Sequence, residues 1–187
     1  MHMDHKSTTT HQRPDDLDRL TGTAVTVTTL VAVAPDDLWD IVSAMHRIGE
    51  FSPECFEVRW VGGTCGAVPG ARFTARSRFP DGVVRSAGGI VDDVETGRRL
   101  AWTMVDLAGV AASRWRYDLE PGSTPGHTVV HHRFEHGPGM TGLRHLAVTD
   151  PSVVARRLGE LTTNMTATLA NMEATALRGA AQFEEAS

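Results

Sequence analysis

The chain has 187 residues, of which 41% are hydrophobic and 22% are charged, and this suits one globular domain with a sizeable core. Its formal net charge of -5 argues against a nucleic-acid partner, which would require clustered Lys and Arg. The sequence contains no apolar run of about eighteen residues, so we expect no insertion into a membrane. Cys55 and Cys65 form neither a CxxC motif nor a disulfide framework.

Residues 1–20 are rich in His, Thr, Asp and Arg and contain no hydrophobic stretch. We therefore expect a disordered N-terminal tail there, not a secretory signal, and a cytoplasmic location. The remaining chain is predicted to form a single domain over residues 21–180, followed by a C-terminal tail over residues 181–187.

The first ordered segment, residues 23–34, alternates β-branched side chains with others and is predicted to be a strand. Pro35 then suits the first turn of a helix, because its φ is already helical and no N–H is needed there. Asp36 and Asp37 suit the positive end of that helix. A turn or a second short helix is expected at residues 50–54.

Residues 55–136 alternate in the same way and are interrupted by Gly, Pro and Asp, which predicts six further strands. Such short turns require antiparallel neighbours. After a loop around residues 138–142, apolar residues recur every three or four positions from Val154 to Ala176. This spacing predicts one amphipathic helix of about 28 residues, roughly 40 Å long. The fold class is therefore α+β, with the long helix covering the apolar face of the sheet.

This pattern resembles the helix-grip, START-like superfamily called SRPBCC, and within it the proteins described as polyketide cyclases or dehydrases. The resemblance implies a seven-stranded curved antiparallel sheet wrapped around the C-terminal helix, two short helices after the first strand, and a cavity between helix and sheet. It spans roughly residues 23–177, and residues 48–55 look like a segment typical of actinobacterial members. The other residues that carry it are Ala34-Pro35, Leu38-Trp39, Gly70 to Phe73, Trp115 to Pro121 and the final helix.

Alternation along the strands, together with the helix stripe, selects the side chains that would line this cavity. Small residues on the strand around Ser86 would leave room for a guest, and methionines on the helix would adapt to its shape. A fully packed core with a bulge at residues 88–89 is the alternative. The predicted ligand-binding residues are Phe73, Ser77, Ser86, Trp102, Met104, Trp115, Tyr117, His132, Phe134, Met165 and Leu169.

His132 and Tyr117 are the candidate catalytic residues, because imidazole and phenol groups can move a proton or anchor a carbonyl. Each is equally explained as a buried core residue with a satisfied hydrogen bond. A shift of one residue in register would replace His132 by His131 on the inner face. His132 and His136 lie about 13 Å apart along a strand, and His131 points the other way, so no metal site is expected. No cofactor is implied.

Three functions remain open. The first is binding of a small hydrophobic or aromatic molecule in the cavity, and the second is an aromatic polyketide cyclase or dehydratase acting through His132 or Tyr117. The third is a stress or interaction module that works through its surface. The partner expected from the first is a small hydrophobic ligand, while the sequence leaves open whether the chain forms a homodimer.

Overall fold

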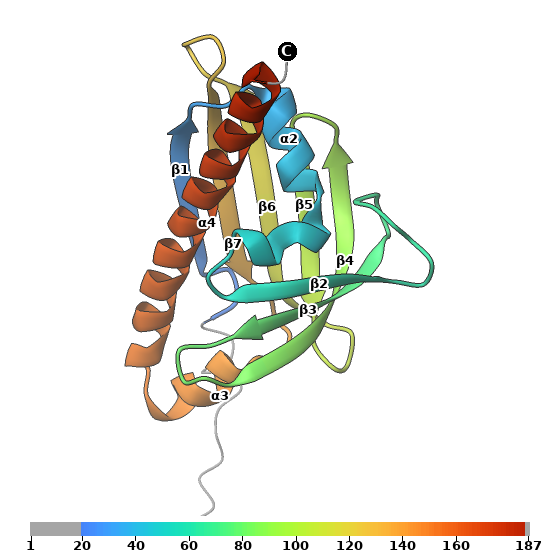
Figure 1. The fold of residues 1–187 in the computed structure, drawn as a ribbon. Coiled ribbons are helices and arrows are strands. Elements are labelled where there is room, and N and C mark those ends of the chain that lie inside the picture. The colour runs from blue at the N-terminus through green and yellow to red at the C-terminus, as the bar shows by residue number, and fades with distance from the viewer. Residues whose placement is uncertain (1–19, 186–187) are drawn as a thin grey trace, which may run out of the picture.

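One antiparallel sheet and one long helix dominate the protein (Figure 1). The computed structural model describes the backbone of residues 20–185 and the side chains of residues 20–179. Residues 1–19 of the tail expected over residues 1–20 lie outside this part of the chain, as do the last two residues. In chain order the elements are β1 (Ala24–Val31), α2 (Pro35–Ser43), η1 (Met45–Glu50), β2 (Cys55–Val61), β3 (Arg72–Arg78), β4 (Val84–Glu95), β5 (Arg99–Val105), β6 (Ala111–Pro121), β7 (Thr128–His136), α3 (Gly142–Thr149) and α4 (Ser152–Glu185).

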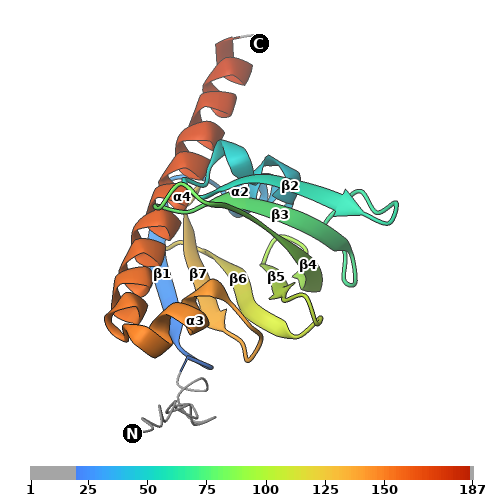
Figure 2. The same cartoon turned by 90° about the horizontal axis from the view of Figure 1, so that it is seen from below.

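The seven strands follow the order β1-β7-β6-β5-β4-β3-β2, and every neighbouring pair is antiparallel. The sheet curves, so that β2 and β3 cross over the half formed by β5, β6 and β7 (Figures 1 and 2). Helix α4 runs along the open side of this curve and packs against β1 and α2. The α+β fold with a helix gripped by a curved sheet is therefore confirmed.

The first helix begins where the sequence predicts. Pro35 occupies its first turn together with Asp36 and Asp37, and its inner face buries Leu38 and Trp39. Strand β7 shows why the register of the sheet is well defined. Its residues are alternately buried and half-buried from Thr128 to His136, so a shift of one position would expose every buried side chain.

One local expectation is made more specific and two are corrected. Of the two alternatives expected at residues 50–54, the turn is found at residues 51–54, and the second short helix, η1, lies before it at residues 45–50. Residues 142–149 form helix α3, where only a loop was expected. Thr141 caps α3 by accepting a hydrogen bond from the backbone N–H of Arg144 at 3.2 Å, and the Arg144 side chain binds the carbonyl of Gly139 at 2.9 Å. Helix α4 has 34 residues instead of about 28 and runs past residue 180, the expected end of the domain.

None of the helices within residues 20–185 combines the length and the apolar character needed to cross a membrane.

Candidate functional site

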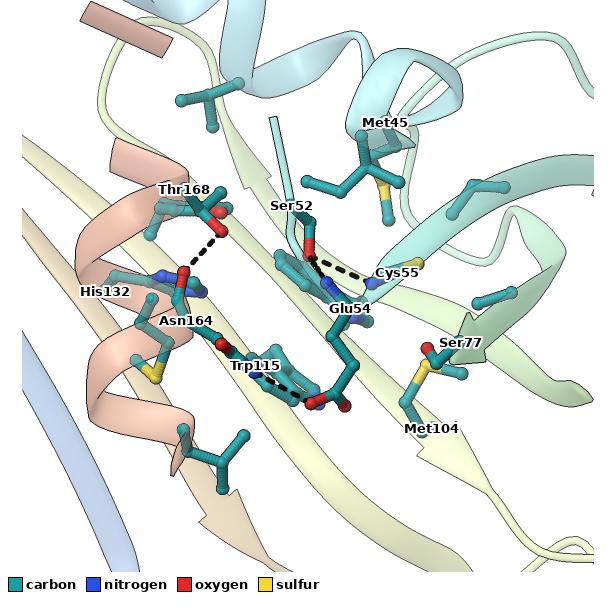
Figure 3. A pocket seen from close by; sticks show the side chains of 18 of the residues that line it. Met45, Ser52, Glu54, Cys55, Ser77, Met104, Trp115, His132, Asn164 and Thr168 are labelled. Atoms are coloured by element: carbon teal, nitrogen blue, oxygen red, sulfur yellow. Dashed lines mark hydrogen bonds between the residues drawn. The ribbon is translucent and has the colours of Figure 1, made fainter. Parts of the chain in front are cut away.

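A pocket of about 150 Å³ lies between the concave side of the sheet and α4, with α2 and η1 closing one side (Figure 3). This volume has room for on the order of ten water molecules, which is comparable to a small one- or two-ring compound. Most of its lining is apolar: Val42, Met45, Ile48, Cys55, Val58, Phe73, Ala75, Trp102, Met104, Trp115, Tyr117, Leu161 and Met165. The polar lining residues are Ser52, Glu54, Ser77, His132, Asn164 and Thr168.

Four aromatic or imidazole rings from β5, β6 and β7 form one wall of this pocket. Trp102 and Trp115 are register partners and lie parallel, with their ring centroids 6.2 Å apart and an angle of 3° between planes. Tyr117 and His132 are also register partners, and their rings stack at 4.1 Å. Such a wall offers flat apolar surface to a flat guest.

Trp115 Nε1 in this wall donates a hydrogen bond to the Ser113 hydroxyl at 3.1 Å, but the polar atoms of Tyr117 and His132 are not bonded in this way. Within the described part of the chain, no residue hydrogen-bonds the Tyr117 hydroxyl or either ring nitrogen of His132. Burial raises the pKa of Tyr117 and lowers the pKa of His132 to about 3. Both groups are therefore neutral near pH 7, and the imidazole offers one N–H donor and one nitrogen acceptor.

Glu54 enters the pocket from the opposite side, directly before β2 (Figure 3). Its carboxylate accepts hydrogen bonds from Arg157 at 2.6 and 2.7 Å and from the amide of Asn164 at 3.0 Å. The Ser52 hydroxyl oxygen accepts from the backbone N–H groups of Glu54 and Cys55, which fixes the turn that presents Glu54. The charge of Glu54 is thus neutralised by the protein itself.

The Cys55 thiol also lines the pocket, where it contacts the carbonyl oxygen of Glu57 at 3.8 Å. Burial raises the pKa of this thiol, so it stays protonated near neutral pH. A protonated thiol is a poor nucleophile, and covalent chemistry at Cys55 is disfavoured.

Most of the predicted ligand-binding residues meet around this pocket. The structure places there Phe73, Ser77, Trp102, Met104, Trp115, Tyr117, His132 and Met165. Phe134 instead packs in the core, with its ring centroid 4.8 Å from that of Trp115, and Leu169 of α4 is also buried in the core.

Ser86 was expected inside and lies exposed on the outer face of the sheet. It pairs with the exposed Arg76, whereas the inward Phe73 pairs with Gly89. Side chains alternate along a strand, so Gly89 and Ala87 face inward and Ser86 cannot. The absence of a side chain at Gly89 makes room for the Phe73 ring, which packs on the backbone of β4: a Cβ atom at Gly89 would lie 2.2 Å from that ring.

Eleven of the nineteen pocket residues were not predicted from the sequence as ligand-binding residues, among them the polar Glu54, Asn164 and Thr168. The sequence pattern of α4 could have identified Asn164 and Thr168, because they stand three and seven positions after Leu161 and therefore lie on the same inward face of the helix. Polar side chains within the apolar stripe of a helix are expected at a site. Glu54 carried no comparable pattern, because it lies in a turn.

The three histidines of β7 do not converge. His131 lies on the outer face, where its Nδ1 is 2.9 Å from the Thr28 hydroxyl, while His132 and His136 face inward. Within the described residues, no three His, Cys, Asp or Glu side chains are grouped so as to hold a metal ion.

The fold and the pocket together define a helix-grip protein with an internal, mostly apolar site. Residues 22–176 match the family described as polyketide cyclase / dehydrase and lipid transport. The match covers most of the chain, so the protein belongs to this family, and the resemblance to the SRPBCC superfamily is confirmed. No curated protein sequence matches the chain.

Solved structures share the fold at low sequence identity. The di-domain ARO/CYC StfQ from the steffimycin biosynthetic pathway is 18% identical, with a TM-score of 0.65, and the match covers 89% of this chain and 54% of StfQ. Protein NE0264 from Nitrosomonas europaea is 18% identical, with a TM-score of 0.60 over 84% of this chain and 96% of that protein. Protein Ms6760 from Mycobacterium smegmatis is 15% identical, with a TM-score of 0.56, covering 87% and 94% of the two chains.

Proposed function

We propose that this protein binds a small hydrophobic or aromatic molecule in the pocket beneath α4. The observation that carries the proposal is the wall of Trp102, Trp115, Tyr117 and His132, which faces a space that protein side chains leave unfilled. Burial of apolar surface would supply most of the affinity, at roughly 25 cal/mol per Å² before ordering costs are subtracted. The family description includes lipid transport, which agrees with a binding role.

A cyclase or dehydratase activity is the second candidate, favoured by the contact between Tyr117 and His132. This reaction needs a group that takes up a proton near neutral pH. Burial lowers the pKa of His132 to about 3, so the imidazole is a weak base in this environment. Glu54 is already held by Arg157 and Asn164. These contacts support binding over catalysis.

A stress or interaction module that acts only through its surface would give the pocket no function. The cytoplasmic location and a homodimer stay predictions from the sequence.

The experiment that tests binding compares two phenylalanine substitutions on neighbouring residues of β3. Ala75 lines the pocket, whereas the side chain of Thr74 is exposed on the outer face. We expect Ala75→Phe to fill the pocket and abolish binding of a fluorescent naphthalene probe, while Thr74→Phe leaves binding unchanged. Native mass spectrometry of protein purified from its own host should then find a retained small molecule in the wild type and none in Ala75→Phe. Equal probe binding by both variants would contradict the proposal.

A further inference from the structure

Two buried imidazoles on the same face of β7 lack hydrogen-bond partners. His132 is 4% exposed and His136 is 5% exposed, and none of their four ring nitrogens finds a partner among the residues that the structure describes. Buried polar groups of native proteins are almost always hydrogen-bonded, so each of these rings requires an explanation.

The surroundings of the two rings differ. His132 belongs to the wall of the pocket, where it stacks on Tyr117 at 4.1 Å and lies 5.7 Å from Trp115. His136 does not line the pocket; its ring packs edge-on against Phe134 at 4.8 Å, near the positive charges of Arg144 and Arg157. Of the two, therefore, only His132 is placed to meet a guest.

We propose that His132 sets the specificity of the pocket by hydrogen-bonding an uncharged, flat guest that carries a hydroxyl or carbonyl group, a role that rests on the proposed binding function. A neutral imidazole has one donor and one acceptor and can satisfy either group. A site that contains such a polar group rejects a hydrocarbon of the same shape, because the hydrocarbon leaves the group unpaired.

The ring can turn a nitrogen toward the guest without disturbing the wall. His132 lines the pocket while both of its nitrogens are buried, so its carbon atoms form the present surface. A half-turn about the Cβ–Cγ bond exchanges the two nitrogens with the two ring C–H groups and keeps the ring in the plane that stacks on Tyr117. Changes of this size are common when ligands bind.

The charges around the pocket favour an uncharged guest. Among the lining residues that the structure describes, Glu54 alone carries a full charge, and its carboxylate already binds Arg157 and Asn164. The lining itself, as described, contributes no Lys or Arg to pair with an anion. An anionic guest would therefore be transferred into apolar surroundings without a counter-charge, which is unfavourable.

The test compares 1-naphthol with naphthalene, which differ by one hydroxyl group, on the full chain by equilibrium fluorescence titration. We expect the wild type to bind both and to prefer 1-naphthol. His132→Phe should weaken 1-naphthol binding about tenfold, the size of one lost hydrogen bond, and change naphthalene binding less than about twofold. His136→Phe is the matched control and should leave both affinities unchanged. His132→Leu is the second variant, should the larger ring disturb folding, and circular dichroism verifies the fold of each.

The outcomes separate the two proposals. A wild type that binds neither compound would overturn the binding function and the specificity role with it. A wild type that binds both, with equal losses for both in His132→Phe and His132→Leu, would overturn only the role of His132. The same would follow if His136→Phe reproduced the selective loss, because the effect would then not depend on contact with the pocket.

Discussion

The Glu54 carboxylate and the Arg157 guanidinium form two parallel hydrogen bonds of 2.7 and 2.6 Å, joining the segment before β2 to α4 beside the pocket. Both side chains are largely buried, with 15% and 16% exposure. Removal of one partner leaves the other charge buried and unpaired, which costs more than the pair itself contributes. The pair therefore holds the rim of the pocket in place.

We expect Arg157→Met to lower the free energy of unfolding by roughly 2 kcal/mol, measured by urea denaturation. Arg47 provides a matched control, because it also binds a carboxylate with two hydrogen bonds, to Glu50, and lies over a phenylalanine ring. That pair is 38% and 51% exposed, so Arg47→Met should have little effect. Equal losses in the two variants would show that burial does not determine the strength of the Glu54–Arg157 pair.

Gly89 and Gly88 test how closely Phe73 packs on β4. An added Cβ at Gly89 would lie 2.2 Å from the Phe73 ring, whereas one at Gly88 would meet only Val105 Cγ2 at 3.5 Å. We expect Gly89→Ala to lower the free energy of unfolding by about 1–3 kcal/mol, because Phe73 must leave its position. Gly88→Ala should change stability by less than about 1 kcal/mol. Thermal unfolding of both variants measures this difference, and similar midpoints would contradict the assigned register.

The sequence was sufficient to predict the fold, because each strand and helix buries one face. This burial produces the alternation of apolar residues in the strands and their spacing of three and four in the helix. The sequence was also sufficient to place Tyr117 and His132 on the inner face, because burial alternates along β6 from Ser113 to Glu120 and along the whole of β7. It failed at Ser86, since the small residues of β4 give no apolar alternation to fix the inward face. Glu54 was not selected as a ligand-binding residue either, because its place in the pocket depends on a turn and on Arg157, 103 positions further along the chain.

His136 offers a test of stability that is independent of the pocket. Its ring nitrogens make no well-formed hydrogen bond among the described residues, although the Ala112 backbone lies close enough to favour the charged imidazole, so an apolar ring should be tolerated better. We expect His136→Phe to raise the free energy of unfolding at pH 7 by about 1 kcal/mol, which corresponds to a midpoint roughly 2–4 °C higher. His131→Phe is the control, because His131 lies on the outer face and bonds Thr28. A lower midpoint for His136→Phe would indicate that its nitrogens are satisfied in solution.

The two buried imidazoles also predict how stability depends on pH. Burial lowers the pKa of His132 to about 3; burial and the nearby Arg144 and Arg157 lower that of His136 to about 4. In the unfolded chain both pKa values return to about 6.5, so below this pH the unfolded state binds more protons than the folded state. Stability is therefore fully present above pH 6.5 and is lost as the pH falls toward 4.

Urea denaturation at pH 7 and pH 5 measures this loss. His132 alone should reduce the free energy of unfolding by roughly 2 kcal/mol at pH 5, and His136 by nearly the same amount, because both folded pKa values lie at least one unit below pH 5. A carboxyl group whose pKa is lowered stays ionised between pH 5 and pH 7 and does not contribute to the change in stability over this range. Asp106 is an example, because it accepts hydrogen bonds from the backbone N–H groups of Met140 and Val110, which lower its pKa. The loss between pH 7 and pH 5 should shrink in His132→Phe and shrink further in the double variant with His136→Phe. An unchanged loss in the double variant would mean that neither imidazole is kept neutral by burial.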